Sequence, residues 1–407
     1  MRKSIFYRKI LLFMLLCGAL KVDAQMVNTG ETIFIDNQGL FYVESTYDHS
    51  DGSILDNGVF QINGNLTNTA ATSNVFAAQS TGVVSLSGAS QIIGGTAKTS
   101  FPNLVLDGTG SATLGFNADV FGTLNLKGKE FKADKYNLTI TNPLANSISR
   151  LTGFVSTDNK GKLIRVTNAS SAYSFPLGSS AGTPIYRPVD IAPMNTNASS
   201  FAITFYNSDP NTLGFNRNNK RSQIQTVFDK YFYVVSEESG TSDANVRFYQ
   251  SATEGEYKQT VKYNNKNQLW ELAPLSTLAD GNFGDQLNRS ITAVYLHTNI
   301  KEEVAIPYSF AISSNITDQF TFYNGISPNN DGKNDKWIVD GLDLFNDNEL
   351  TIFNRWGDEV FKKKNYSSVN AWDGGSLNQG TYFYVLKVND VSGATKVYKG
   401  YITLIKE

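Results

Sequence analysis

The sequence contains little of the chemistry on which many enzyme sites depend. Its 407 residues include one cysteine and two histidines. A single cysteine excludes an internal disulfide framework and a cysteine-rich zinc site, and two histidines leave few ways to build a histidine-based site. Charged residues make up 18%, below the roughly 25% typical of soluble domains. With a formal net charge of −2, no clustered positive field is expected, which argues against a nucleic-acid-binding body.

Long apolar runs are also missing, apart from one near the amino terminus. Four basic residues precede an apolar stretch from Ile10 to Leu20, and Val22-Asp23-Ala24 follows. This pattern predicts a secretory signal peptide over residues 1–24, cleaved between Ala24 and Gln25. The stretch is short for a membrane span of about 20 residues, which disfavours an uncleaved anchor. A lipoprotein modified at Cys17 is a further alternative, disfavoured because the bulky Leu16 precedes the cysteine.

Cleavage after Ala24 would change the composition of the working molecule. It would remove five basic residues and one acidic residue, taking the formal charge from −2 to −6, and it would also remove the cysteine. No later segment is apolar enough to cross a membrane as a helix. We therefore expect an extracytoplasmic chain without a transmembrane segment, stabilised by packing and backbone hydrogen bonds alone.

The rest of the chain has the patterning of an all-β protein. Short runs rich in Val, Ile, Thr, Phe and Tyr are separated by Gly, Asn, Asp and Ser, without sustained helical periodicity. In residues 25–144 apolar pulses recur at a spacing of roughly 20 residues, namely at Val59–Ile62, Val83–Leu86, Leu104–Leu106, Leu124–Leu126 and Leu138–Ile140. This region is predicted to be a repetitive, solenoid-like β-structure. The alternative is an ordinary antiparallel sandwich.

Residues 145–316 have a different texture, with longer and more aromatic strands. The stretch Lys230–Val235, for example, alternates Tyr231, Tyr233 and Val235 with Phe232 and Val234. Such alternation is typical of a sandwich strand with one buried face. We interpret this region as a β-sandwich passenger domain.

The last 91 residues, 317–407, predict a separate small domain. Short amphipathic strands alternate with turns, and glycines at Gly374 and Gly380 suit positive-φ turn positions. Asn354–Gly357 is expected to turn the chain after one strand, with Arg355 free to stack on an aromatic ring or pair with an acid. About seven strands in this length indicate an immunoglobulin-like sandwich.

The motifs of this segment resemble a known family, the gliding-motility-associated carboxy-terminal domain of Bacteroidota, which is the type B sorting domain of the type IX secretion system. The resemblance covers about residues 320–407, and its motif residues are Pro328, Asn329, Asp331, Gly332, Asn334, Asp335, Asn354, Arg355, Trp356, Gly357, Trp372, Asp373, Gly374, Gly380, Thr381, Tyr382, Lys399, Gly400 and Tyr401. It implies transport to the periplasm by the signal peptide, then recognition by the type IX translocon and attachment at, or release from, the cell surface. The alternative is the last sandwich of an adhesin.

One of these motifs also suggests a cation site. Asn329, Asp331 and Asp335 cluster around Gly332, as oxygen ligands do in Ca²⁺ loops. Aligned with an EF-hand loop, however, the position of the bidentate Glu falls on Ile338. A turn in which these side chains bond their own backbone is the favoured interpretation, and no cofactor other than Ca²⁺ is indicated.

The remaining candidate residues give no clear catalytic pattern. His49 lies in a polar stretch and is expected in a solvated loop, whereas His297 falls at a strand end; neither is near a nucleophile-elbow motif. The acidic pairs Glu237-Glu238 and Glu254/Glu256 are expected as exposed loop charges. Trp270 could stack on a sugar, but core placement is favoured.

The sequence therefore favours a non-enzymatic, cell-surface or secreted protein with an adhesive or structural passenger that needs no cofactor. Its expected partners are the type IX secretion machinery and a glycan or other surface ligand. The rival hypotheses are a secreted carbohydrate-active enzyme, whose paired carboxylates would be spatial rather than sequential, and a carbohydrate-binding protein.

Overall fold

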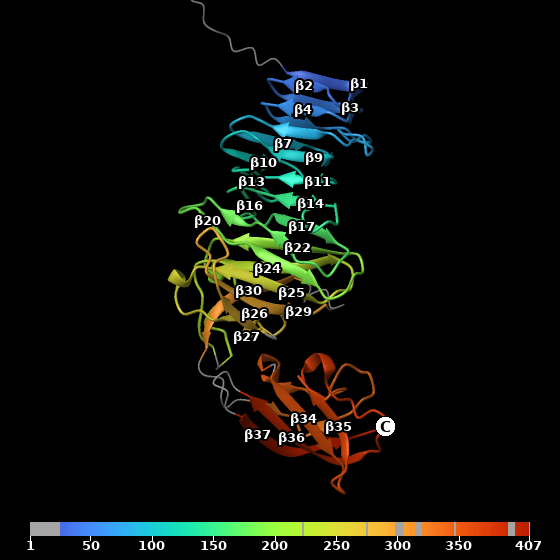
Figure 1. Cartoon of the computed structure of the whole chain (residues 1–407), viewed down its shortest axis with the longest axis vertical. Coiled ribbons are helices and arrows are strands. Elements are labelled where there is room, and N and C mark those ends of the chain that lie inside the picture. The colour runs from blue at the N-terminus through green and yellow to red at the C-terminus, as the bar shows by residue number, and fades with distance from the viewer. Residues whose placement is uncertain are drawn as a thin grey trace, which may run out of the picture.

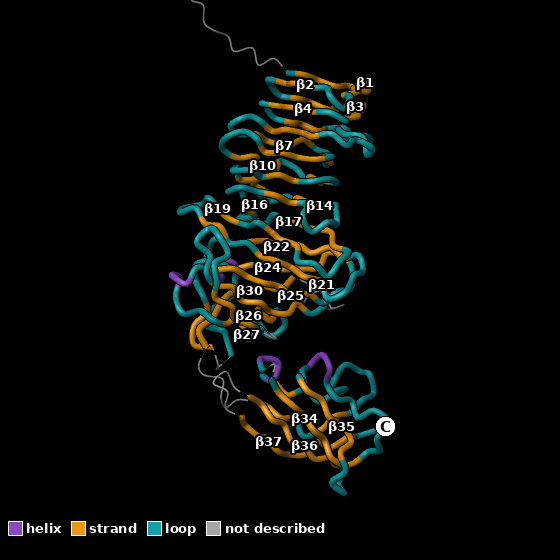
Figure 2. Tube along the Cα trace, in the orientation of Figure 1, coloured by secondary structure: helices purple, strands orange, loops and turns teal. Residues whose placement is uncertain are grey.

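The structure is a computed structural model that describes residues 25–221, 224–273, 276–297, 305–313, 320–345, 347–389 and 395–406. The predicted signal peptide, residues 1–24, lies outside the described residues. Strands account for nearly all regular structure, and the helical segments of the described part are short 3-10 turns (Figure 2). None of the described residues forms a helix with the length and hydrophobicity needed to cross a bilayer. The all-β prediction is confirmed.

The amino-terminal region is a parallel β-solenoid whose strands lie in stacked layers (Figure 1). Its first sheet contains β1 (Met26–Ile35), β3 (Tyr47–Asp56), β5 (Leu66–Asn68), β7 (Gln91–Gly95), β10 (Ser111–Leu114), β13 (Glu130–Lys132) and β16 (Phe154–Ser156). Its second sheet contains β2 (Leu40–Val43), β4 (Val59–Ile62), β6 (Val83–Leu86), β9 (Asn103–Leu106), β12 (Leu124–Asn125) and β15 (Ile148–Ser149). The third begins with β8 (Thr99–Phe101), β11 (Ala118–Val120), β14 (Asn137–Ile140) and β17 (Lys162–Thr167).

The apolar pulses of the sequence are the stacked strands of this solenoid. The first four pulses form β4, β6, β9 and β12, which are neighbours in the second sheet, whereas the fifth forms β14 in the third sheet. Register partners in the second sheet, such as Val59 and Val83 or Leu104 and Leu124, are 24 and 20 positions apart. The solenoid prediction is confirmed, and the uneven coil length explains why the repeat is imperfect in the sequence.

Asparagine side chains connect successive coils, which explains a polar composition with few charges. In five cases an asparagine side-chain oxygen accepts a hydrogen bond from a backbone N–H one coil further on, at Asn57, Asn65, Asn74, Asn103 and Asn117. Gly108 supports the same close stacking, because a Cβ there would lie 1.9 Å from the carbonyl oxygen of Gly88 in the coil before it. The amides thus satisfy backbone donors between coils, and the glycine allows two coils to approach closely.

The solenoid and the sandwich share one sheet. β17 pairs with β14 in parallel on one edge and with β22 (Ser199–Tyr206) antiparallel on the other. The sheet then continues through β24 (Phe232–Ser239), β30 (Ala305–Ser313), β26 (Gln259–Asn264) and β27 (Leu269–Leu272), while β23 (Ile224–Val227) also pairs with β30. Parallel pairing of the first sheet also runs past residue 144, to β16. The sequence predicted a boundary between two regions at residues 144/145, which lie in a loop, and strand pairing connects the two sides of it, from β13 to β16 and from β14 to β17.

A second, antiparallel sheet packs on the shared sheet to complete the sandwich. It contains β18 (Tyr173–Phe175), β21 (Val189–Pro193), β25 (Ala244–Gln250), β29 (Arg289–Tyr295) and β28 (Thr277–Asp280), and β19 (Gly178–Ser179) pairs with β20 (Ile185–Tyr186) beside it. Rings contact across the two sheets, as in Phe201 on Tyr295 and Phe248 on Tyr308. One hydrophobic core runs without interruption from Ile35 to Phe310. The two predicted regions are therefore packed as one body.

Arg165 on β17 joins the solenoid to the sandwich from inside. Its side chain is fully buried and donates hydrogen bonds to four oxygens, those of the Ser174, Leu144 and Ala145 carbonyls and of the Ser147 hydroxyl, at 2.7 to 3.0 Å. Burial lowers the pKa of Arg165 to about 10, so the guanidinium remains charged at neutral pH. The bonds hold the last solenoid turn against the first strand of the facing sheet.

The carboxy-terminal domain has its own core and seven strands in its described part. A terminal sheet has the order β32 (Gly325–Ile326), β37 (Thr395–Leu404), β36 (Gly380–Asn389), β34 (Asn348–Phe353) and β35 (Glu359–Lys364). β31 (Thr321–Phe322) pairs with β33 (Val339–Asp340) in a separate two-stranded ladder. The carboxy-terminal domain also contains the short 3-10 turns η4 (Leu342–Leu344) and η5 (Ser368–Asn370). The sandwich contains two such turns, η1 (Pro210–Leu213) and η2 (Ala252–Glu254).

Candidate functional site

The terminal sheet gathers the motif turns at one of its ends. Phe353, the last residue of β34, is the register partner of Phe383 near the start of β36, and Gly380 at that start pairs with Leu404 at the end of β37. Ile326 also pairs with Leu404, so the loop that follows β32 leaves from the same end. Motifs that are up to about 70 residues apart in the sequence therefore lie around one edge of the domain.

The Asn354–Gly357 motif forms the hairpin turn between β34 and β35. The Asn354 side-chain oxygen accepts hydrogen bonds from the backbone N–H groups of Trp356 and Asp358, at 2.9 and 3.0 Å, which fixes the turn. Gly357 has a φ of +90°, a conformation that favours glycine. The Arg355 guanidinium lies 4.6 Å from the centre of the Trp356 ring, and Trp356 is 75% exposed. The expected turn and the expected stacking of Arg355 are both present.

This turn lines a shallow groove together with the start of β36. The groove has a volume of about 450 Å³, and its lining includes Asn354, Arg355 and Trp356 from one motif and Gly380, Thr381 and Tyr382 from another. Tyr382 is anchored by its hydroxyl, which donates to the Asn378 carbonyl at 2.7 Å. The structure thus brings two of the predicted motifs into one surface feature.

Trp372 belongs to the core of the domain and not to this surface. Its carbonyl accepts a hydrogen bond from the Trp337 N–H at 2.7 Å, and its own N–H donates to the Tyr366 hydroxyl at 2.9 Å. Asp373 then accepts from the Gly375 N–H at 2.9 Å, and Gly374 has a φ of +81°. A Cβ at Gly374 would also lie 2.7 Å from a methyl carbon of Leu404. This motif therefore places Trp372 in the core of the domain and turns the chain at Asp373 and Gly374.

The Asn/Asp-rich loop is held together by its own backbone. One carboxylate oxygen of Asp335 accepts from the N–H groups of Asn329 and Asn330 at 3.0 and 2.7 Å, and the other accepts from Gly332 at 2.8 Å. Asn329 and Asp331 likewise accept from backbone N–H groups two residues ahead. Pro328 and Asn334 flank the loop, where the Asn334 carbonyl accepts from the Ser327 N–H. The oxygens of the candidate Ca²⁺ ligands therefore serve as turn acceptors.

The last motif places its three residues on opposite faces of β37. Lys399 and Tyr401 are exposed, with Tyr401 48% exposed. Gly400 lies on the core-facing side, opposite Tyr384. The motif thus exposes two side chains at the surface, whereas its third residue packs against the core.

Two expectations about passenger residues are wrong. His49 is fully buried on β3, because it alternates with Tyr47 on the inward side of a solenoid strand, and it is not in a solvated loop. Glu237 is also buried, on β24, and its carboxylate lies 2.5 Å from the His297 Nδ1. Its second oxygen accepts from the Ser242 N–H at 2.9 Å. Sequence patterning did not reveal this pair, because its members are 60 positions apart.

The other candidate acids and Trp270 have structural partners. Glu238 pairs with Lys162 and Glu256 with Lys258, at 2.8 and 2.7 Å. Glu254 accepts hydrogen bonds from Arg187 and from the Tyr231 hydroxyl, the latter at 2.7 Å. Trp270 is fully buried in a satellite cluster outside the main core, as expected. The described residues contain no group of three or more His, Cys, Asp or Glu side chains placed to hold a metal ion.

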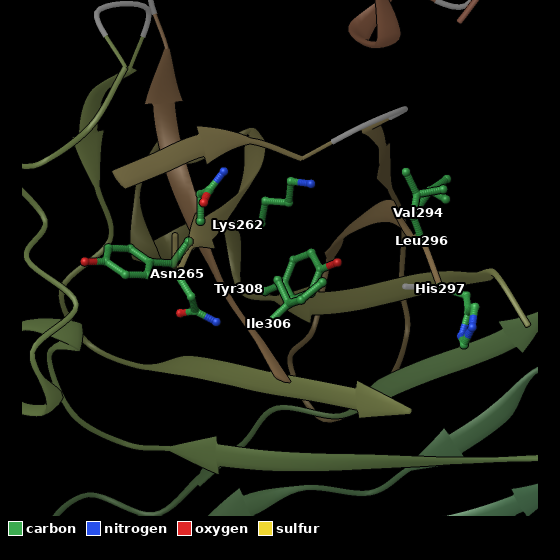
Figure 3. Close-up of a pocket in the computed structure, with 9 residues that line it drawn as sticks. Lys262, Asn265, Val294, Leu296, His297, Ile306 and Tyr308 are labelled. Carbon is green, nitrogen blue, oxygen red and sulfur yellow. The ribbon is translucent and has the colours of Figure 1, made fainter. Parts of the chain in front are cut away.

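A cavity of about 280 Å³ lies at one end of the sandwich (Figure 3). Its lining comes from β26, β29 and β30 and the residues that follow them, and consists of Lys262, Tyr263, Asn264, Asn265, Val294, Leu296, His297, Ile306 and Tyr308. Figure 3 shows the ring of His297 turned away from Tyr308. Of its lining residues, only His297 was singled out by the sequence.

Comparison with known proteins identifies the class of the carboxy-terminal domain. Residues 320–404 match the family model of the CHU_C type IX secretion signal domain. The resemblance carried by the motifs is confirmed, and it implies interaction with the type IX secretion machinery and export to the cell surface or secretion. The match leaves residues 25–319 without a family. No curated protein and no solved structure matches the chain.

Proposed function

We propose that the chain is a cell-surface or secreted protein that crosses the inner membrane by its amino-terminal signal peptide and the outer membrane by its type IX signal domain. The match of residues 320–404 carries this proposal. The position of the motif turns at one end of the terminal sheet supports the proposal, because a secretion machinery needs an accessible and rigid surface to bind.

The passenger is proposed to be non-catalytic and to act as a structural or adhesive surface. Its solenoid and sandwich share one sheet and one core, which gives a rigid body that can hold a binding surface away from its point of attachment. Glu238, Glu254 and Glu256 are engaged in ion pairs, which favours a structural use of these acids. Cleavage of a defined polysaccharide by the purified chain would overturn this part of the proposal.

Deletion of residues 320–407 tests the export function. The truncated passenger should accumulate in the periplasm and disappear from the surface and the medium, because the secretion signal is gone. Protease accessibility of intact cells and fractionation would measure both pools. A truncated chain that reaches the surface in wild-type amounts would contradict the proposal. A folded passenger in the periplasm, detected by its resistance to limited proteolysis, separates loss of export from loss of folding.

A further inference from the structure

Three aromatic side chains form a row across the terminal sheet. Phe353 on β34 is the register partner of Phe383 on β36, and Phe383 is in turn the partner of Tyr401 on β37. The three strands lie side by side in Figure 1. Cross-strand partners lie on the same face of a sheet, with Cβ atoms about 5 Å apart. The three side chains are therefore neighbours on one face of the domain.

This face is the one that does not cover the core of the domain, and we call it the open face. The residues that alternate with the row along the three strands belong to the hydrophobic core, namely Ile352, Tyr382, Tyr384 and Ile402. Successive side chains of a strand point to opposite faces, so the row points away from the core. Phe383 and Tyr401 are each 48% exposed. Neighbouring exposed apolar side chains, unlike single ones, mark an interaction site.

Lysines surround the aromatic row. Their register places four of them on the open face, namely Lys362, Lys364, Lys387 and Lys399. Glu349 and Glu359 share this face, and the Glu349 carboxylate lies 3.3 Å from the Lys362 Nζ. Lys387 and Lys399 form no ion pair with any residue that the structure describes. The open face therefore has an excess of positive charge, although the chain as a whole has a formal charge of −2.

The open face also carries exposed residues of the sorting motifs. Lys399 and Tyr401 belong to the last motif, and Phe353 directly precedes the Asn354–Gly357 turn. The match of residues 320–404 to a secretion signal domain implies that the secretion machinery interacts with this domain. An exposed aromatic row that adjoins two motifs is available for that interaction.

We propose that the open face is the docking surface for a protein component of the type IX secretion machinery, and that the component offers an apolar recess edged by acidic side chains. This inference rests on the export function proposed above and specifies the surface that serves it. The aromatic row provides the central contact, because aromatic residues are enriched in the buried centre of protein interfaces. The lysines provide a charged rim, which favours an acidic partner and disfavours a basic one.

A second copy of the chain is a poorer occupant of the open face. In a two-fold symmetric dimer the same patch lies on both sides of the interface. Lys387 and Lys399 would then approach the lysines of the other copy, and like charges across an interface are unfavourable. The excess of lysine therefore favours a partner of opposite charge.

A photo-crosslinking side chain in the full chain identifies the occupant. Benzoylphenylalanine takes the place of Phe383 in secreting cells, and mass spectrometry identifies the adduct after illumination. We expect an adduct with an outer-membrane component of the secretion machinery. The matched control places the same side chain at exposed Lys363, whose register partner is the core residue Leu350, so that it lies on the other side of β35.

Four results of this experiment would overturn the proposal. Three are an adduct that joins position 383 to a second copy of the chain, to a polysaccharide or to a lipid. The fourth is an adduct with the machinery that is no more abundant from position 383 than from position 363.

Two variants of the full chain test the chemistry of the open face. Phe383→Thr removes the central ring, and Lys399→Glu reverses a charge beside it. We expect each to lower the surface-exposed amount of the chain at least about threefold, with a matching rise in the periplasm, because an interface loses an anchor or gains a like-charge contact. Lys363→Glu makes the same charge change on the other side of β35 and should be exported as the wild type is. Unchanged urea midpoints of the terminal domain separate lost docking from lost folding.

The outcomes distinguish this inference from the export function itself. Wild-type surface amounts of both Phe383→Thr and Lys399→Glu, or an equal loss in Lys363→Glu, would overturn the docking surface and leave the export function intact. Surface display that survives deletion of residues 320–407 would overturn both.

Discussion

Gly400 lies directly opposite Tyr384 in the ladder between β36 and β37. A Cβ added to Gly400 would lie 2.6 Å from the Tyr384 hydroxyl oxygen, which is far inside contact distance. The Tyr384 ring packs in turn on Trp337, with 4.6 Å between the ring centroids. The glycine of this sorting motif therefore provides the space in which a core tyrosine lies.

Replacement of this glycine should destabilise the terminal domain. We expect Gly400→Ala to lower its free energy of unfolding by about 1–3 kcal/mol, because the added methyl must displace the Tyr384 ring. Urea unfolding followed by tryptophan fluorescence measures this, since three of the four tryptophans lie in this domain. Gly325→Ala is the matched control in the same sheet, because its Cβ would lie 3.5 Å from the nearest atom, the Thr403 oxygen. Equal stability of the two variants would contradict the packing role of Gly400.

Asp335 should stabilise its loop without a cation. Its carboxylate accepts three exposed backbone hydrogen bonds, so Asp335→Ala removes the acceptor that closes the loop and should cost about 0.5–1.5 kcal/mol. We expect addition of Ca²⁺ to leave the melting temperature of the wild-type chain unchanged. A rise in melting temperature with Ca²⁺ that Asp335→Ala abolishes would instead establish a cation site at Asn329, Asp331 and Asp335.

His49 should make the solenoid less stable in acid. Burial lowers the pKa of His49, only partly opposed by the nearby Asp51, so its folded pKa lies below the ordinary value of 6.5. Above pH 6.5 the ring is neutral in both states and stability is complete. As the pH falls below 6.5 the unfolded chain binds the proton first, and stability declines by at most about 1.4 kcal/mol per pH unit until the folded pKa is reached.

The variant His49→Phe isolates this contribution. Urea midpoints at pH 8 and pH 5 should fall further apart in the wild-type chain than in His49→Phe, because all other ionisable groups are common to both chains. An identical pH dependence of the two chains would show that His49 does not resist protonation.

Arg165 should couple the solenoid to the sandwich. Arg165→Met keeps apolar bulk but leaves four partly or fully buried oxygens without their donor, and we expect a loss of about 1–3 kcal/mol. Arg247→Met, at an exposed arginine on β25, should change the free energy of unfolding by less than about 0.5 kcal/mol. Urea unfolding followed by circular dichroism compares them. A loss no larger than that of the control would contradict a joining role for Arg165.

Trp356 should matter for export and not for folding. Its ring is 75% exposed beside Arg355, so Trp356→Ala should change stability by less than about 0.5 kcal/mol. We expect the substitution to reduce the amount of protein on the cell surface, because it removes the exposed ring that lines the groove between the Asn354–Gly357 turn and the start of β36. Val369→Ala, at an exposed residue outside the motifs, is the control. Wild-type surface amounts of Trp356→Ala would show that the secretion machinery does not use this ring.

Local sequence patterns were sufficient to predict the strands and the sorting domain. Alternating Tyr231, Tyr233 and Val235 indicated a sandwich strand, and all three are buried on β24 or beside it. The expected single buried face is wrong, because Phe232 on the opposite face is also buried, against Tyr206 and Phe215. The motif turn at Asn354–Gly357 was predictable because an asparagine that bonds its own backbone and a glycine at positive φ are local features. The burial of His49 was not predictable in this way, because the direction of its side chain depends on the register that β3 adopts in the solenoid.

The sequence by itself determined an all-β chain, a repeating amino-terminal part and a type IX secretion signal domain, since these depend on periodicity and on contiguous motifs. The tertiary structure decided that the solenoid continues into the sandwich through β17, that Glu237 meets His297, and that Lys262 lies beside Tyr308. Each of these depends on strand order and register between segments far apart in the chain. A single sequence does not encode those pairings in any local pattern, because they are set by the packing of the whole core.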